Sequence, residues 1–173
     1  MKMRWMTLLL TLGWALATGY QVQGEAVYEA RAPLGAFQGV NPTLKGQVVF
    51  DLSKGQLQGR VCLDLAAWDS KEPLRDRHTR DMFQVDRYPQ ACLTVTGYDA
   101  QKGLVQGTLS LHGVEKKVAW TLRYTLAEGG KRVSFEGEFE LLLSDYGLKA
   151  PTFMGMRVQD RVMVRVKGQG VAQ

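Results

Sequence analysis

Apolar and polar residues alternate along most of the chain from Val48 onward. Within residues 57–65, for example, Leu57, Val61 and Leu63 occupy odd positions while the even positions are mostly polar. A period of two is typical of strands that bury one face, and helical spacing is almost absent. The pattern predicts about eight strands. They lie near residues 26–32, 46–52, 57–65, 91–98, 104–111, 117–126, 132–143 and 158–168.

Glycine-containing turn segments separate these strands. They occur at residues 53–55, 101–103, 112–113, 128–130 and 145–147. Tight turns of this kind join consecutive strands in antiparallel order. Without alternating helices, the pattern indicates an up-and-down barrel or a sandwich, and closure into a barrel removes exposed edges. We therefore predict an all-β, antiparallel up-and-down barrel of about eight strands with one short helix.

Three glycines interrupt the apolar side of their strands. Gly59, Gly107 and Gly137 each have the parity of the neighbouring apolar residues, so they are expected to face inward. A small barrel is either filled by side chains or holds one ligand, and three missing side chains favour a hollow. The alternative at each position is a bulge or a sharp bend, which glycine also marks.

One charged segment, residues 70–83, departs from the strand pattern. Ser70 suits a helix cap and Pro73 suits a first turn, so the segment predicts a short helix that forms a plug or lid across one barrel end. The alternative is a solvated charged loop. In the helical interpretation one face carries Leu74, His78 and Met82.

The N-terminus has the features of a secretory signal. Lys2 and Arg4 precede an apolar stretch, residues 5–17, that ends in small residues. The stretch is short for a membrane span, although an uncleaved anchor is the alternative. Cleavage near Ala17 removes two basic and no acidic residues, which lowers the formal net charge from +5 to +3. We expect one mildly basic, exported domain, residues 18–173, in the periplasm or outside the cell.

Three segments resemble the YceI family in the order in which that family carries them. They are the charged segment with its following strand at residues 75–95, the Leu-x-x-His-Gly-Val-like segment at residues 107–120, and the Asp-Tyr-Gly segment within residues 144–148. The opening region, residues 28–46, and the segment around residues 68–70 depart from the family pattern. The resemblance implies a secreted or periplasmic, lipocalin-like barrel that holds a polyisoprenoid or similar lipid.

Strand parity directs an uncharged set of side chains into this barrel. Burial of apolar surface contributes about 25 cal/mol per Å², so a long chain could gain roughly ten kcal/mol before entropic costs. The alternative is that the same side chains fill the lumen by packing together. The predicted lumen residues are Val48, Phe50, Val61, Leu63, Phe83, Leu93, Val95, Leu109, Leu111, Trp120, Leu122, Phe135, Gly137, Phe139, Leu141, Val162 and Val164.

Basic residues gather in the predicted helix. A polar head group would stay near water at the mouth, and the arginine fork suits phosphate or carboxylate. The alternative is an exposed face balanced by its acidic neighbours. The candidate head-group contacts are Arg75, Arg77, His78 and Arg80, with Arg87 beside them.

The two cysteines, Cys62 and Cys92, fall on outward positions of strands that should be neighbours. In an exported protein an even cysteine count favours a disulfide, which would contribute roughly 3–4 kcal/mol. Two free thiols are the alternative if the register separates them.

The sequence carries no recognisable catalytic pattern. His78 and His112 are the only histidines and lack metal-ligand spacing, and no serine-nucleophile elbow, phosphate loop or dinucleotide fingerprint occurs. We therefore predict no enzyme activity, metal or cofactor, and the mild charge argues against nucleic acid as a partner.

The predicted function is an exported binding or carrier protein for a long apolar lipid. The candidate ligands are a polyisoprenoid, a quinone or a fatty-acid-like chain, and transient contact with a membrane surface is compatible with this role. The alternative is an envelope structural or interaction protein whose barrel is filled by side chains.

Overall fold

A computed structural model describes residues 17–51 and 54–173. The predicted signal, residues 1–17, therefore lies outside the described residues apart from Ala17.

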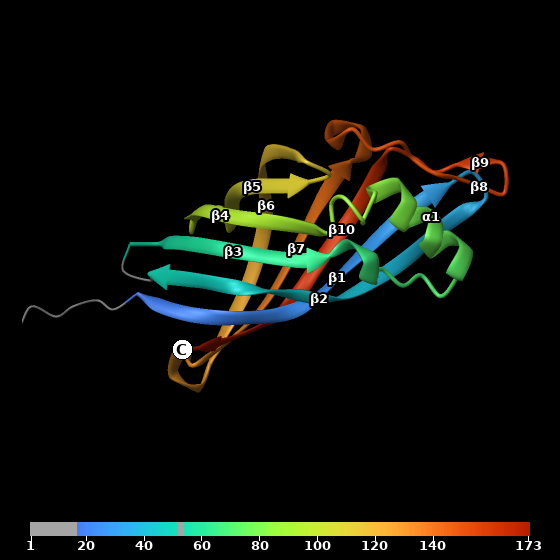
Figure 1. Ribbon diagram of the computed structural model, residues 1–173. Helices are drawn as coiled ribbons and strands as arrows, with labels where there is room; N and C mark the ends of the chain where they lie inside the picture. Colours follow the sequence, from blue (N-terminus) through green and yellow to red (C-terminus); the bar gives the residue numbers. More distant parts are fainter. Residues whose placement is uncertain (1–16, 52–53) are drawn as a thin grey trace, which may run out of the picture.

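Eight long strands form one closed antiparallel barrel (Figure 1), in the order β1-β10-β7-β6-β5-β4-β3-β2. This confirms the predicted fold class. A separate short hairpin, β8 and β9, covers Thr152–Phe153 and Met156–Arg157. The barrel strands are β1 (Thr18–Ala32), β2 (Gly35–Asp51), β3 (Gln56–Asp64), β4 (Gln90–Asp99), β5 (Leu104–Leu111), β6 (Val114–Ala127), β7 (Arg132–Leu142) and β10 (Arg161–Ala172).

The first two strands are longer than the alternation predicted. β1 begins at Thr18 rather than near residue 26, and β2 begins at Gly35 rather than near residue 46. Early in β1, Tyr20 and Val22 are buried at even positions. The glycine and glutamine residues between them weaken the apolar alternation. The segment is still a strand, because β1 pairs with β2 on one side and with β10 on the other.

The inward glycines do not hollow the barrel as the sequence suggested. A Cβ added at Gly59 or Gly107 would overlap backbone oxygens of the neighbouring strand, those of Gln47 and Thr94. At these two positions glycine allows the backbones of adjacent strands to approach closely. At Gly137 a Cβ would lie 3.1 Å from the indole ring of Trp120, so that side chain covers the position.

Helix α1 (Pro73–Phe83) lies across one end of the barrel, as Figure 1 shows, and the predicted helix is confirmed. Its buried residues are Asp76, Thr79 and Phe83. A short 3₁₀ turn, η1 (Leu65–Ala67), leads out of β3 toward it. Two further 3₁₀ turns, η2 (Glu128–Gly130) and η3 (Leu143–Tyr146), follow β6 and β7.

One detail of the predicted helix is wrong. The residue that caps α1 is Glu72 and not Ser70, and no side chain caps its first turn. Ser70 instead donates its hydroxyl to Asp76 Oδ1 at 2.6 Å and its N–H to the same oxygen at 3.0 Å. Leu74, which was predicted to share a face with His78 and Met82, is 52% exposed, and the helix turns its Asp76, Thr79 and Phe83 side toward the barrel.

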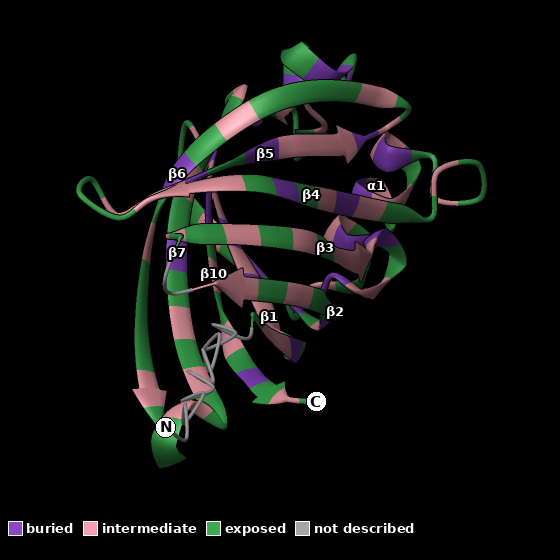
Figure 2. Ribbon diagram, turned by 90° about the vertical axis from the view of Figure 1, so that its left-hand side faces the viewer, coloured by how far each residue is buried: buried purple, intermediate pink, exposed green. Residues whose placement is uncertain are grey.

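The two ends of the barrel differ in burial (Figure 2). At the end under α1, the core includes Leu65, Trp68 and Phe83, which are at most 8% exposed. At the opposite end Phe50 and Tyr98 are only partly buried and Tyr124 is 36% exposed. The helix therefore plugs one end, and the other end is more open to solvent.

Cys62 and Cys92 stand directly opposite each other in the β3–β4 pairing. The structure joins them by a disulfide, with Cα atoms 4.1 Å apart and a sequence separation of 30 residues. The loop that this bond closes carries η1 and α1.

Candidate functional site

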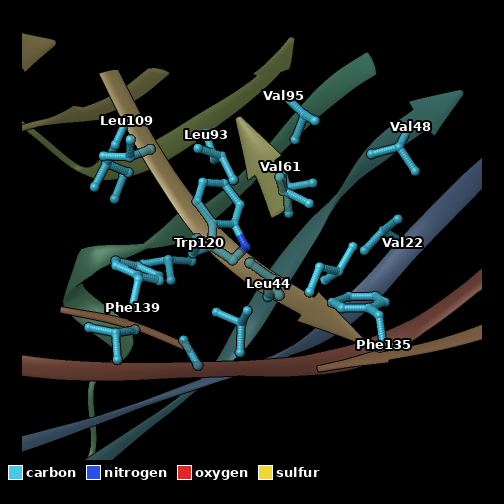
Figure 3. A pocket seen from close by; sticks show the side chains of 18 of the residues that line it. Val22, Leu44, Val48, Val61, Leu93, Val95, Leu109, Trp120, Phe135 and Phe139 are labelled. Carbon is cyan, nitrogen blue, oxygen red and sulfur yellow. The ribbon is translucent and has the colours of Figure 1, made fainter. Parts of the chain in front are cut away.

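The barrel interior contains a cavity of about 210 Å³. Side chains from all eight barrel strands, together with Leu65, Trp68 and Phe83, line it. Figure 3 shows the labelled aliphatic and aromatic side chains converging on this space. No charged residue belongs to the lining, and the polar groups among it are tyrosine hydroxyls and tryptophan N–H groups.

Most of the predicted lumen residues line this cavity. Gly137 does not, because Trp120 covers it, and Val162 faces a second cavity under α1 instead. The predicted residues that line the lumen are Val48, Phe50, Val61, Leu63, Phe83, Leu93, Val95, Leu109, Leu111, Trp120, Leu122, Phe135, Phe139, Leu141 and Val164.

Sequence reasoning missed a further part of the lining. Some of these residues lie in the portions of β1 and β2 that were not recognised as strand, although the even-numbered apolar residues from Tyr20 onward carried the signal. Others have the parity of residues that were predicted and were simply not included. The missed residues include Tyr20, Val22, Ala26, Leu44, Leu57, Val105, Val118, Val133 and Val166.

Register shifts explain why parity alone gives an incomplete lining. In β4 the pairing with β5 shifts between Val95 and Gly97, and Tyr98 then faces the lumen although its number is even. A bulge inserts one residue, which moves every later side chain of that strand to the other face. A second shift lies opposite Gly24 and Ala26 of β1.

Three aromatic rings meet at the open end of the lumen. Phe50, Tyr98 and Tyr124 come from β2, β4 and β6, and their ring centroids are 5.6 to 6.3 Å apart in edge-on contacts. Burial raises the pKa of Tyr98, and Tyr124 and Asp99 act in the same direction. We call these three residues the aromatic rim.

A second cavity of about 80 Å³ lies beneath α1. The ends of β1, β2, β7 and β10 and the helix enclose it, with Tyr28, Phe37 and Met82 in its wall. The side chains common to this cavity and the lumen form a partition between them. The partition residues are Trp68, Phe83, Leu141 and Val164.

Only two of the four predicted head-group residues line a cavity. Arg75 and His78 belong to the wall of the cavity beneath α1, whereas Arg77 and Arg80 belong to neither cavity. Arg75 donates from Nε to the Ser70 hydroxyl at 2.9 Å and from one terminal nitrogen to the Ser70 carbonyl at 3.0 Å. Its guanidinium carbon lies 4.4 Å from the centre of the Phe37 ring.

His112 connects the β5–β6 turn to two other elements. Its Nδ1 lies 3.0 Å from the Tyr146 carbonyl oxygen in η3, and its Nε2 lies 2.9 Å from the Gln84 side-chain oxygen after α1. The ring also makes an edge-on contact with Tyr88. These contacts give His112 a structural role in holding the plugged end together.

Among residues 17–51 and 54–173, histidines, cysteines and carboxylates form no group of three or more that could hold a metal ion. None of the helices in this part of the chain has the length and apolar character needed to cross a membrane.

A closed antiparallel barrel with an apolar lumen and a helix across one end is a lipocalin-like binding fold. More particularly, the chain belongs to the YceI family, because the YceI-like domain model matches residues 21–169. This confirms the resemblance that the sequence motifs indicated. The family is one of binding domains.

Relatives and solved structures agree with this assignment. A UPF0312 protein of Pseudomonas savastanoi pv. phaseolicola is 29% identical over 161 residues, covering 84% of each chain. Protein YceI of Shigella flexneri is 32% identical over 123 residues, covering 65% of this chain and 62% of that protein.

Among solved structures, Burkholderia cenocepacia BcnA has a TM-score of 0.73 at 18% identity, covering 84% of this chain and 95% of that one. A polyisoprenoid binding domain from Saccharophagus degradans, implicated in plant cell wall breakdown, has a TM-score of 0.71 at 19% identity and covers 89% of this chain and 98% of that one. At these identities the structural similarity concerns the fold.

Proposed function

We propose that this protein binds or carries a long apolar lipid, with the chain of the lipid in the barrel lumen. The observation that carries the proposal is the lumen lining, which is apolar and uncharged from the aromatic rim to the partition. The polyisoprenoid binding domain of Saccharophagus degradans, which shares the fold, supports this choice of ligand class. A polyisoprenoid, a quinone or a fatty-acid-like chain would fit the lining.

Simple energetics favour a lipid over a small polar ligand. Each Å² of apolar surface removed from water contributes about 25 cal/mol, so several hundred Å² would outweigh the several kcal/mol lost on association. A charged ligand buried in the lumen would find no compensating charge there. Binding of this kind requires no cofactor and no catalytic residue.

The place of action that we propose is the periplasm or the outside of the cell. The predicted signal at residues 1–17 supports export, and a disulfide between Cys62 and Cys92 is stable in an oxidising compartment. In this proposal the domain, residues 18–173, would contact membranes transiently to exchange lipid. Of the predicted head-group residues, Arg75 and His78 line the cavity beneath α1, so they would lie nearest to a head group bound there.

The direct test is to purify the exported protein from a bacterial envelope, extract it with organic solvent and identify the extract by mass spectrometry. A long-chain lipid at about one molecule per barrel is the expected result, and it would also identify the ligand class. If nothing is extracted and added isoprenoids and fatty acids fail to bind, the protein is better explained as an interaction protein with a filled barrel.

A pair of variants tests whether the lumen is where the lipid binds. Val61 lines the lumen, whereas Val49 of β2 is 47% exposed on the outside. Val61→Trp should occupy the cavity and reduce lipid affinity at least tenfold, because the lipid then competes with an indole ring for the same space. Val49→Trp should leave affinity unchanged in a fluorescent-lipid titration, and equal affinities for both variants would place binding elsewhere.

A further inference from the structure

Two residues in the wall of the cavity beneath α1 each carry a buried polar atom that lacks a hydrogen-bond partner among the described residues. These atoms are the Tyr28 hydroxyl and Trp68 Nε1. Both residues are 8% exposed, and their rings are in edge-on contact with centroids 5.1 Å apart. Burying such an atom without a hydrogen bond costs free energy, and phenylalanine could occupy either place without that cost. The pair therefore indicates a position where a bound molecule supplies the hydrogen bonds.

The surroundings keep the Tyr28 hydroxyl neutral. Burial is the largest cause that raises the pKa of Tyr28, and the Asp76 carboxylate raises it further. The nearby hydroxyls of Ser70 and Thr79 and the charge of Arg75 act in the opposite direction, although neither hydroxyl meets the geometry of a hydrogen bond with Tyr28. At neutral pH both unpartnered atoms are thus uncharged, one able to donate and accept and the other only able to donate.

The cavity wall disfavours a charged ligand group. Arg75 is the charged side chain in this wall. Two of its nitrogens already donate to Ser70, and its guanidinium group lies over the Phe37 ring. Apolar side chains such as Met82, Leu143 and Val162 form much of the remainder. A phosphate or carboxylate would lose its hydration in this wall, whereas a carbonyl or hydroxyl oxygen requires only the hydrogen bonds that Tyr28 and Trp68 can make.

We propose that the cavity beneath α1 binds an uncharged, oxygen-bearing head group, which accepts hydrogen bonds from Trp68 Nε1 and the Tyr28 hydroxyl while the lipid chain lies in the lumen. The inference rests on the proposed function, since it assumes that a lipid occupies the lumen. Trp68 makes the connection, because its side chain lines both cavities. The two hydroxyl-bearing residues of the aromatic rim lie at the other end, so the lipid would enter with its head group first.

Ligands that share one chain length and differ only in the head group test this proposal. We would measure the binding of hexadecane, hexadecanol, methyl palmitate and palmitic acid to the full mature protein by displacement of a fluorescent lipid. The alcohol and the ester should bind about five- to tenfold more tightly than hexadecane, which corresponds to one or two hydrogen bonds. Ionised palmitic acid should bind no more tightly than its methyl ester.

Matched variants assign the effect to the two side chains. Tyr28→Phe and Trp68→Phe should each remove most of the preference, measured as the ratio of alcohol or ester affinity to the hexadecane affinity of the same variant, because Trp68 also lines the lumen and its substitution can change hexadecane binding itself. Tyr20→Phe and Trp120→Phe are the controls: Tyr20 donates its hydroxyl to the Gly130 carbonyl at 2.7 Å, and both residues line the lumen away from the second cavity. Both controls should keep the preference.

The outcomes separate this inference from the proposed function. If wild type binds all four ligands equally, or if the Tyr28 and Trp68 variants keep the preference, the head-group site is overturned and lipid binding stands. If no ligand binds, both proposals fail. Lipid-free Tyr28→Phe should melt at a temperature no lower than wild type, because its lost hydroxyl has no protein partner. A clear fall in Tm would contradict the premise of the inference.

Discussion

At the scale of single residues, Gly59 and Gly107 show that an inward glycine can allow close strand packing instead of enlarging a lumen. Each lies on the inward side of its strand, as the sequence indicated, but the space that a Cβ would take belongs to backbone atoms of the next strand. Close approach of two strands lets the sheet coil tightly enough to close. The wall of the lumen is formed by uncharged side chains, and these glycines do not belong to it.

Replacing Gly107 by alanine should therefore destabilise the barrel without filling the lumen. The new methyl group would press on the Thr94 carbonyl and on Val95 Cα, and overpacking of this kind costs about 1–3 kcal/mol of unfolding free energy. Urea unfolding would measure the change. Gly97→Ala is the control, because the nearest atom to its Cβ is the end of the Gln106 side chain at 3.5 Å, and it should change stability by less than about 0.5 kcal/mol. Equal effects at the two positions would contradict this explanation.

Most of the lumen lining was predictable because alternation fixes which residues share a face. Val61, Leu93 and Leu109, for example, follow directly from the period of two and line the cavity. Tyr98 did not follow, since a register shift in β4 reverses the parity before it. Bulges depend on pairing with a neighbouring strand, and a single sequence does not contain that information in readable form. The Tyr28 and Trp68 pair was likewise hidden, because only the folded structure leaves their polar atoms without partners.

At the scale of elements, α1 is fastened to the barrel by a buried carboxylate. Asp76 accepts hydrogen bonds from the N–H and the hydroxyl of Ser70, and Arg75 holds the same serine from the other side. Val40 and Asp69 exchange two backbone hydrogen bonds of 2.9 Å, which join the segment before the helix to β2. These contacts place the plug over the second cavity.

Loss of the Asp76 carboxylate should loosen the plug. Asp76→Ala leaves the Ser70 N–H and hydroxyl without their acceptor in a buried site, which should lower the free energy of unfolding by about 2–3 kcal/mol. Hydrogen exchange of α1 amides should accelerate more than that of the barrel strands. The exposed Asp81 of the same helix provides the control, and Asp81→Ala should leave both measurements near wild type. Unchanged exchange in α1 for the Asp76 variant would show that other contacts hold the helix.

The helix itself could be predicted from the sequence, whereas the way it is attached could not. Pro73 and the charged composition marked a short helix, but the capping role expected for Ser70 was wrong because its hydroxyl is directed to Asp76. The hydrogen-bond choice of a serine depends on which acceptor the folded chain brings near it. The early part of β1 was missed for a related reason, since its pairing with β10 lies at the far end of the sequence.

At the scale of the whole molecule, the barrel has one packed end and one half-open end. The helix, Trp68 and Phe83 close the first, and the aromatic rim of Phe50, Tyr98 and Tyr124 surrounds the second. This arrangement assigns α1 to the role of a plug, and in the proposed function a ligand would enter at the rim. The sequence predicted a plug or lid at one end but could not distinguish between these roles, because burial at the opposite end depends on how all eight strands close.

Weakening the rim should speed lipid exchange. Tyr124→Ala and Phe50→Ala each remove two of the three ring contacts. Because an aromatic pair contributes about 0.5–1.5 kcal/mol, loss of two pairs should accelerate lipid release about five- to 150-fold. Stopped-flow release of a fluorescent fatty acid would measure the rate. Tyr88→Ala serves as the comparison, since Tyr88 contacts His112 at the plugged end, and it should leave the release rate unchanged. If the Tyr88 variant alone accelerates release, the ligand passes α1 instead.

The pairing of β1 with β10 has a consequence for how the protein is made. The strand nearest the start of the described chain is completed only by the strand nearest its end, through a register that runs from Tyr20 opposite Ala172 to Glu29 opposite Met163. Until the last strand is available, β1 and β7 each present an unpaired edge, and such edges promote association between chains. Pairing over so long a sequence distance is also slow to form. A chain cut before Arg161 would therefore form an open sheet that is prone to aggregation. The closed barrel can form only after β10 has been synthesised.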